Sequence, residues 1–540
     1  MLPLREVRTL DMAMDDGARL KADVYRPVGE ARYPVLVMRQ PYGRKIGSTV
    51  VLAHPAWYAA QGYVVLVQDV RGRGESEGRF RVLEDDVADG ARTLELAAEI
   101  AGGDGKVASY GFSYHGMNQY MALAGALGRG SRPPDAMAIV MAAFDVRNHW
   151  AYEGEAFRLA GGQMWARQMG VEAARRAGER DLAARLATSA APLHGGPRAA
   201  RPELLEAAAS HTHYFDWLSD DPAYWARVSP AARLAGAKPE VPVLHVGGWH
   251  DLMLAGTLAA HRAFPNSQLV IGPWAHIPWG RRLGALDVGD GAADGVDPAI
   301  VAFFDHHLKG REDPSPAIRL YDVGAQRWRG FAAEPATQLR AFYLGSGGRA
   351  AASTLNGVLR GTPAALEDRL VHDPWRPAPA VGGALGSPGL YADRAAVDDR
   401  ADVLTYTSEP LAQPLILAGE PVATLSVNSL QPSFDLALAL SFVRPDGAAV
   451  HICGAFRSFA RAPNGPARLA LGATFLTLPA GARLRLSIQA AAFPAFAVNP
   501  GTGERAVDAH VLDAVTTTLI ISGSAEAPAA LALPVLVSDG

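Results

Sequence analysis

The sequence has very little cysteine: Cys453 is the single cysteine in 540 residues. One thiol cannot form an intramolecular disulfide, and it excludes every metal site that needs several cysteines. Cys453 lies in the strand-like segment VHICGAF, where we expect a small buried side chain rather than a reactive thiol. The lack of disulfides is consistent with a reducing compartment.

An excess of charge of one sign is also missing. The chain has 51 lysine and arginine residues against 55 aspartate and glutamate residues, which gives a net charge of −4. Proteins that bind nucleic acid or anionic membrane surfaces usually carry a clear basic excess. We therefore expect neither kind of partner.

Long apolar runs are lacking as well. No segment approaches the ~18 uninterrupted apolar residues that a membrane-spanning helix needs. The N-terminal segment MLPLREVRTLDM carries Arg5, Glu6 and Arg8 and has no apolar core of the kind found in secretory signals. We expect a soluble, cytoplasmic protein.

The first third of the chain contains a regular alternation of strand-like and helix-like segments. Continuous apolar runs rich in β-branched residues alternate with segments of helical periodicity, and such runs suit strands buried on both faces of a largely parallel sheet. The strand-like runs are 35–38, 63–67, 106–110 and 136–141, and the helical segments are 85–99 and 113–127. The pattern predicts an α/β domain with helices on both faces of the sheet.

Two changes of character mark further units. Between 146 and 235 strand-like runs disappear, and the segment is helical in period and rich in alanine, arginine and aromatic residues. A helical block between strands of one sheet is typical of a cap, and strands return at 241–246 and 268–271. From about 345 short alternating strands separated by glycine and proline indicate an all-β sandwich.

One serine lies between a predicted strand and a predicted helix, in the segment Gly111-Phe112-Ser113-Tyr114-His115-Gly116. A nucleophile at such a junction sits on a sharp turn that projects its Oγ above the sheet, and small neighbours relieve the crowding. The backbone N–H of Tyr114 then lies at a helix N-terminus, where it can stabilise an oxyanion. The motif is weak alone, because 56 glycines make it common by chance and its second glycine stands one position later than usual.

Two further candidates follow later strands. Asp251 ends the segment GGWHD after the strand VPVLHV, and His276 ends the segment GPWAH after the strand QLVI. An isolated aspartate in such a turn is more often a helix N-cap, and an isolated loop histidine is more often structural. The order Ser113, Asp251, His276, with each residue at a strand end, nevertheless favours a catalytic triad. His250 competes for the role of the base, but it precedes the acid.

These motifs belong to an ordered set that resembles the CocE/NonD family of serine hydrolases. This family joins the S15 group of X-Pro dipeptidyl-peptidases, bacterial cocaine esterase and α-amino acid ester hydrolases. The segments that carry the resemblance run from residue 14 to residue 503: MDDGARLKADVYRP, RQPYGRK, QDVRGRGESEGRF, VASYGFSYHG, GGWHDL, IGPWAH, FFDHHLKG, YDVGAQRWRG, YTSEPL and FPAFAVNPGTG.

The resemblance implies a fold class, α/β, with an α/β-hydrolase domain, an inserted helical cap and a C-terminal all-β jelly-roll domain. We expect the hydrolase domain at 1–145 and 236–344, the cap at 146–235 and the jelly roll at 345–540.

The resemblance also implies roles for individual residues. Ser113, Asp251 and His276 match the triad, and Tyr42 matches a tyrosine whose hydroxyl completes the oxyanion hole together with the N–H of Tyr114. The glycine-rich stretch 69–74 looks superficially like a phosphate loop. The resemblance implies that it is a structural loop beside the sheet. Met253 matches a pocket-lining position of the esterase branch. Among the cap aromatics we expect Trp150, Phe157 and Trp165 to line a substrate pocket.

Such a site hydrolyses acyl compounds without a cofactor or a metal ion. The aromatic cap favours a small-molecule carboxylic ester with an apolar or aromatic acyl group. An α-amino acid ester hydrolase, a β-lactam acylase or an X-Pro dipeptidyl-peptidase stays open as an alternative. The α-ammonium group of such a substrate would need carboxylates to hold it. The cap offers Asp145, Glu153, Glu155, Asp216, Asp220 and Asp221.

A carbohydrate-binding protein with a relict hydrolase domain is the alternative from another class. The intact set of serine, aspartate and histidine argues against it. The sequence leaves open whether the protein forms a homo-oligomer and whether it prefers esters, amides or peptides.

Overall fold

The apolar runs of the first third form the central strands of one large sheet. The computed structural model describes residues 1–45, 50–189, 198–219, 221–277, 279–293 and 295–537. The ten strands of this sheet lie in the order β1-β2-β4-β3-β5-β6-β9-β10-β13-β14. They are β1 (Arg8–Ala13), β2 (Arg19–Tyr25), β3 (Tyr33–Gln40), β4 (Val64–Asp69), β5 (Gly103–Phe112), β6 (Ala136–Val140), β9 (Val243–His250), β10 (Ser267–Ala275), β13 (Ile318–Asp322) and β14 (Arg327–Phe331).

The seven strands from β4 to β13 run parallel to one another, while β1, β2 and β14 are antiparallel to their neighbours. Strands β4, β6 and β9 are buried along their whole length. Burial on both faces requires helices on both sides, because each face of an apolar strand must be covered.

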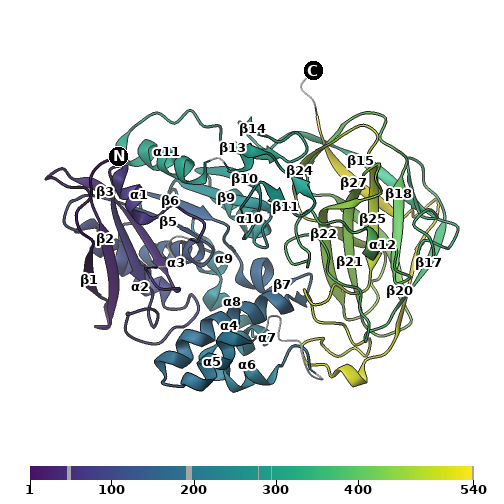
Figure 1. Ribbon diagram of the computed structural model, residues 1–540, viewed down its shortest axis with the longest axis horizontal. Helices are drawn as coiled ribbons and strands as arrows, with labels where there is room; N and C mark the ends of the chain where they lie inside the picture. The colour runs from purple at the N-terminus through teal and green to yellow at the C-terminus, as the bar shows by residue number, and fades with distance from the viewer. Residues whose placement is uncertain (46–49, 190–197, 220, 278, 294, 538–540) are drawn as a thin grey trace.

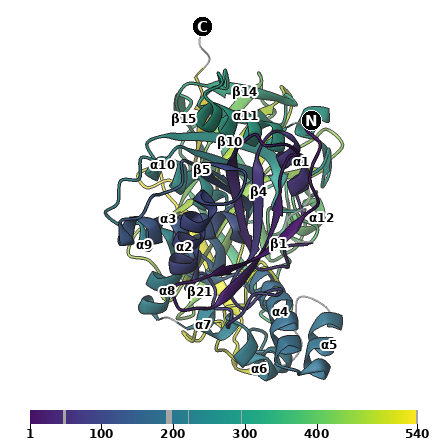
Figure 2. The same ribbon diagram turned by 90° about the vertical axis from the view of Figure 1, so that its left-hand side faces the viewer.

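Helices cover both faces of this sheet, as Figures 1 and 2 show. α1 (Pro55–Ala60) and α11 (Val296–Lys309) contribute Tyr58, Phe303 and Phe304 to the core on one face. The other face is covered by α2 (Asp86–Ala98), α3 (Tyr114–Arg129) and α10 (Leu254–Ala263). The α/β-hydrolase fold predicted for this domain is therefore confirmed.

The cap stands between β6 and β9 in the chain. It begins with a π-helical turn, η2 (Arg147–Ala151), and a short hairpin of β7 (Tyr152–Glu153) and β8 (Ala156–Phe157). Its helices are α4 (Leu159–Arg176), α5 (Arg180–Thr188), α6 (Glu203–Ala207), η3 (Ala209–His211), α7 (Tyr214–Leu218), α8 (Pro222–Val228) and α9 (Pro230–Arg233). Helices α4 to α7 of the cap lie at the bottom of Figure 1, whereas α9 lies near α3 and α10.

The C-terminal third forms a thirteen-stranded β-domain, drawn on the right of Figure 1. Its strands are β15 (Thr337–Gly345), β16 (Val358–Arg360), β17 (Leu366–His372), β18 (Val403–Ser408), β19 (Leu415–Gly419), β20 (Val422–Ser429), β21 (Phe434–Val443), β22 (Ala449–Phe459), β23 (Ala467–Ala470), β24 (Thr474–Leu478), β25 (Arg483–Gln489), β26 (Thr517–Gly523) and β27 (Ala530–Leu536). Strand β15 pairs with β27 from Thr337 to Tyr343, so the β-domain includes residues before 345.

The β-domain packs against the rest of the molecule. One continuous apolar core joins Leu254, Leu269 and Ile271 of the hydrolase domain to residues such as Leu417 and Leu476 of the β-domain. None of the helices in the described ranges combines the length and the apolarity that a bilayer crossing requires.

Candidate active site

Ser113 stands alone between the end of β5 at Phe112 and the start of α3 at Tyr114. Its backbone angles, φ 62° and ψ −120°, lie outside the regions that ordinary residues favour, and such strain costs about 1–3 kcal/mol. The turn is held in place because the Ser113 N–H donates to the carbonyl of Val140 at the end of β6 (2.8 Å). The side chain is thereby fixed at the carboxyl edge of the sheet, where α/β proteins place their sites.

Two glycines make this turn sterically possible. A Cβ at Gly111 would come within 2.4 Å of the His115 Cβ, and one at Gly116 would come within 2.8 Å of the Ala142 Cβ. At Gly116, α3 packs so closely against the residues that follow β6 that no side chain fits. This contact explains why the second glycine stands three residues after the serine.

His276 joins Ser113 to Asp251. Its Nε2 lies 2.9 Å from the Ser113 Oγ, and its Nδ1 lies 2.8 Å from the Asp251 Oδ1. His276 directly follows β10 and Asp251 directly follows β9, and these two strands are parallel neighbours. The three side chains therefore meet because their strands end at the same edge of the sheet.

The Asp251 side chain is fully buried, and the His276 side chain is 21% exposed. Asp251 does not cap α10, because the N-cap of that helix is Met253. The ring of Phe112 packs against the His276 ring, with 4.5 Å between the ring centroids. The imidazole is held by a hydrogen bond to Asp251 on one edge and by an aromatic ring on one face.

His250 faces away from Ser113. Its ring contacts Tyr391 and His451 of the β-domain, with ring centroids 4.1 Å and 5.8 Å away. Burial lowers the pKa of His250 to about 3, so this imidazole stays neutral at ordinary pH. Its position removes it from competition with His276.

The Tyr42 hydroxyl lies beside the serine. Tyr42 belongs to the loop after β3, and its N–H donates to the Gln40 side chain (2.7 Å). Burial raises the pKa of Tyr42 to about 12, while hydrogen bonding to Trp165 and Ser113 acts in the opposite direction. The phenol therefore stays protonated and can donate a hydrogen bond.

Tyr114 can contribute only its backbone to an oxyanion site. Its hydroxyl donates to the Asp86 carboxylate (2.6 Å) and accepts from the Leu83 N–H (2.9 Å). Its own N–H is the first of α3 and so has no acceptor within the helix. This N–H and the Tyr42 hydroxyl are the two donors that the family resemblance implies for the oxyanion hole.

The four predicted pocket residues all belong to one apolar core, but they differ in their neighbours. Trp165 donates to the Tyr42 hydroxyl (3.2 Å), and Trp150 packs on Trp165 with ring centroids 4.4 Å apart. Phe157 instead packs against Tyr152 and Tyr214 within the cap, and only 3% of its surface is exposed. Met253, two residues beyond Asp251, is buried in the same apolar core.

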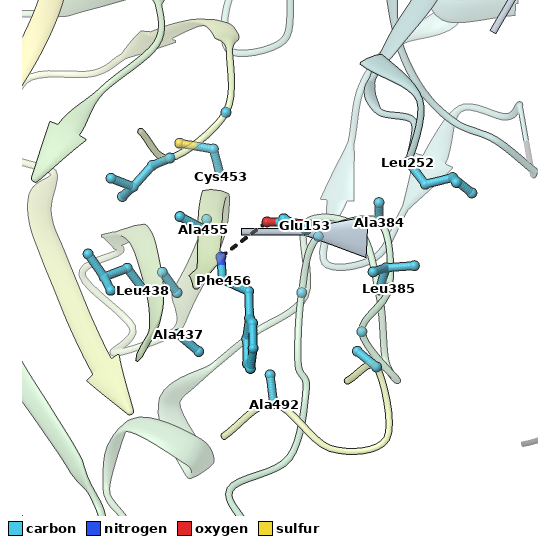
Figure 3. A pocket seen from close by; sticks show the side chains of 18 of the residues that line it. Glu153, Leu252, Ala384, Leu385, Ala437, Leu438, Cys453, Ala455, Phe456 and Ala492 are labelled. Carbon is cyan, nitrogen blue, oxygen red and sulfur yellow. Dashed lines mark hydrogen bonds between the residues drawn. The ribbon is translucent and has the colours of Figure 1, made fainter. Parts of the chain in front are cut away.

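A cavity of about 350 Å³ lies between the three domains, next to the turn that carries Asp251. Figure 3 shows Leu252 on one side of it and the β-domain residues Leu438 and Phe456 on the other. Glu153 from the cap accepts a hydrogen bond from the Phe456 N–H (3.1 Å) and pairs with Arg158 (2.9 Å). Asp251 is one of the residues that line this cavity, whereas Ser113 and His276 are not, so the cavity adjoins the triad on the side of its acid.

Sequence reasoning missed two arginines that hold the site in place. Arg158 donates to the carbonyl of Leu252, next to Asp251 (2.8 Å). Arg73 connects the loop after β3 with helix α4. Arg158 and Leu252 are 94 residues apart in the chain, and Arg73 and Met169 are 96 residues apart. A local sequence motif cannot indicate contacts over such separations. In the described part of the chain no group of three histidine, cysteine or acidic side chains is arranged to hold a metal ion.

A mainly parallel hydrolase sheet with a strained serine, a neighbouring histidine and a buried aspartate defines the class: the protein is a serine hydrolase. Residues 16–278 match the family model described as X-Pro dipeptidyl-peptidase (S15 family). Residues 310–531 match the model of the C-terminal non-catalytic domain of X-Pro dipeptidyl-peptidases. The chain belongs to the CocE/NonD family of S15-type serine hydrolases.

Comparison with individual proteins agrees with this assignment. The chain is 31% identical to the cocaine esterase of Rhodococcus sp. (strain MB1 Bresler) over 571 residues, with 97% of each chain covered. An aminopeptidase of a marine sediment archaeon, Thaumarchaeota archaeon, superposes with a TM-score of 0.82 at 21% identity, over 99% of this chain and 97% of the other. An α-amino acid ester hydrolase superposes with a TM-score of 0.80 at 23% identity and the same coverage. These two structures show the shared fold.

Proposed function

We propose that the protein hydrolyses carboxylic esters through an acyl-enzyme formed on Ser113. The observation that carries this proposal is the pair of hydrogen bonds that joins Ser113 to His276 and His276 to Asp251. The 31% identity to a cocaine esterase supports ester chemistry in particular.

In the proposed mechanism, His276 Nε2 takes the proton of the Ser113 hydroxyl as Oγ attacks the ester carbonyl. Asp251 keeps its own charge, holds Nδ1–H in place and stabilises the imidazolium that forms. The imidazolium then returns the proton to the leaving alcohol. Water, activated by the same His276, attacks the acyl-enzyme and releases the acid.

The negative charge that develops on the carbonyl oxygen needs donors already in place. Tyr42 supplies a hydroxyl and Tyr114 supplies a backbone N–H in this proposal. Because the pKa of Tyr42 is raised to about 12, the phenol donates without giving up its proton.

The proposed acyl group is neutral and apolar or aromatic. Trp165 bonds to Tyr42 and Trp150 packs on Trp165, and in this proposal the two rings offer aromatic surface on the acyl side. The cap carboxylates that could hold an α-ammonium group are already engaged: Glu153 pairs with Arg158, Glu155 pairs with Arg147, and Asp145 accepts from Asn148. A substrate with a free amino group would have to share one of these carboxylates with its present partner.

Two other cap carboxylates offer no better site for an α-ammonium group. Asp221 accepts from the Ala223 N–H at the start of α8, and Asp216 is exposed. Asp220 lies outside the described residues. Amino-ester and X-Pro hydrolysis therefore rank behind ester hydrolysis.

A fluorophosphonate probe tests this proposal, because it labels only an activated serine. We expect labelling of the wild type and of a Ser353→Ala control, whose serine is exposed in the β-domain. Ser113→Ala should abolish labelling and lower ester turnover by several orders of magnitude without loss of folding. Residual turnover within about tenfold of wild type would contradict the assignment of Ser113.

The acyl preference is tested with paired substrates. Aryl and alkyl esters should be hydrolysed with a higher kcat/KM than amino-acid esters or amides of the same alcohol or amine. A reversed order would move the protein to the amino-ester branch of the family.

A further inference from the structure

A hydrogen bond joins the cap to the proposed oxyanion hole. Trp165 on α4 directs its indole N–H at the Tyr42 hydroxyl, with 3.2 Å between the nitrogen and the oxygen. An indole N–H can only donate, so the Tyr42 oxygen is the acceptor in this bond. The one hydrogen of the Tyr42 hydroxyl therefore remains available for a different acceptor.

We propose that Trp165 is a positioning residue that fixes the Tyr42 hydroxyl as an oxyanion donor. This inference rests on the proposed function, and it assigns to Trp165 a role beyond contact with the acyl group. With the indole occupying one side of the oxygen, the O–H points away from the cap and toward the serine side. Hydrogen-bond donation to the oxygen also polarises the O–H and strengthens the bond that it donates.

The surroundings of Trp165 keep its ring in one orientation. Its side chain is only 6% exposed. Rings of Trp150 and His213 lie 4.4 Å and 4.2 Å from its ring, measured between centroids, and the Trp217 ring stacks on it at 5.6 Å. A ring packed on several sides loses little conformational entropy when it forms the hydrogen bond to the Tyr42 hydroxyl.

Arg73 holds the two partners at a fixed separation. Its Nε donates to the carbonyl of Pro41, the residue before Tyr42 (2.8 Å). Its Nη1 donates to the carbonyl of Met169, one helical turn after Trp165 (3.0 Å), and its Nη2 pairs with Glu172 (2.7 Å). The guanidinium is 2% exposed, and it connects the Tyr42 loop and helix α4 as a rigid bridge.

The cap is then part of the catalytic apparatus as well as a wall of the pocket. Any shift of α4 relative to the sheet would withdraw the indole donor and free the Tyr42 hydroxyl to rotate about its C–O bond. The cost would appear in transition-state stabilisation, because the oxyanion forms only there.

Trp165→Phe removes the indole N–H and keeps an aromatic ring. We expect kcat for an aryl ester to fall about tenfold, the loss expected for one orienting hydrogen bond. Tyr42→Phe alone should lower kcat by about 10²- to 10³-fold. Adding Trp165→Phe to Tyr42→Phe should cause little further loss, because Trp165 acts through the hydroxyl that is already gone.

Trp225→Phe is the matched control, since it reduces the same aromatic cluster at a tryptophan of α8 that packs on Tyr152 and Trp217. It should change kcat less than threefold or so, as expected for packing alone. Benzothienylalanine at position 165, which has the shape of tryptophan without the N–H, should reproduce the loss of Trp165→Phe.

Several outcomes would overturn the inference. Equal losses from Trp165→Phe with and without the Tyr42 hydroxyl would make Trp165 an independent packing or pocket residue. Full kcat with benzothienylalanine would do the same. An unchanged kcat in Tyr42→Phe would instead remove Tyr42 from the oxyanion hole, and both the proposed oxyanion hole and the role of Trp165 would fail together.

Discussion

Asp251 is the residue whose role is least visible in its local sequence. It follows a glycine-rich turn that would suit a helix N-cap, yet its carboxylate is fully buried and bonded to His276 Nδ1 at 2.8 Å. A buried carboxylate requires a partner, because its desolvation is costly. The imidazole is that partner among the described residues, which is the arrangement a catalytic acid needs.

Asp251→Asn should lower kcat by on the order of 10³- to 10⁴-fold. The amide would favour the imidazole tautomer that carries its proton on Nε2, and this tautomer cannot accept the Ser113 proton. The measurement is steady-state ester hydrolysis, with the melting temperature as a check on folding. Asp216→Asn, an exposed carboxylate of the cap, is the control and should retain full turnover. A loss below tenfold in Asp251→Asn would show that His276 is oriented by other means.

Strand β21 contains an acidic residue with an unusual titration. Asp435 is 2% exposed, and burial raises its pKa to about 7 although Ser458 and Asn499 both hydrogen-bond to it. The folded protein keeps this proton between about pH 4 and pH 7, where an unfolded chain has lost it. The resulting contribution to stability is complete below about pH 4 and is lost as the pH rises through about 7.

Asp435→Asn should therefore flatten the pH dependence of stability. The wild type should lose stability relative to the variant as the pH rises from about 5 to about 8, by on the order of a few kcal/mol at most. Thermal or urea unfolding at several pH values measures the difference. The exposed Asp399→Asn provides the control and should leave the wild-type dependence in place. Parallel pH profiles for the wild type and Asp435→Asn would contradict the raised pKa.

At the scale of the whole molecule, the β-domain supports the other two domains. Strand β21 is buried on both faces over nine of its ten residues, more than its own sandwich explains. Arg505 donates to the carbonyl of Leu218 in the cap, and Arg201 of the cap pairs with Asp508. These contacts join the cap to the segment between β25 and β26.

A chain truncated after residue 331, where β14 ends, should be insoluble or inactive. The cut would expose the apolar core that joins Leu254 and Leu269 to the β-domain, and surfaces of this kind drive aggregation. Solubility, ester hydrolysis and probe labelling measure the outcome. A soluble fragment with the full activity of the complete chain would show that the β-domain is an independent module.

Several features of the protein follow from local sequence alone. Continuous apolar runs indicate buried parallel strands because both faces of such a strand must leave water. The order of Ser113, Asp251 and His276, each after a strand, predicts that they meet, since parallel strands end at one edge. The unusual place of Gly116 was visible in the sequence, but its reason, the close approach of α3 to Ala142, was not.

The tertiary structure decided which of several equivalent candidates take part. His250 and His276 both follow strands, and only packing directs one toward Ser113 and the other toward Tyr391. Phe157 and Trp165 are both aromatic residues of the cap and cannot be told apart by sequence. Of the two, Trp165 bonds to Tyr42, a residue 123 positions away. Local sequence determines which segments become strands or helices, because those preferences depend on neighbours in the chain. Side-chain direction at the site depends on contacts between distant segments, and these exist only in the folded molecule.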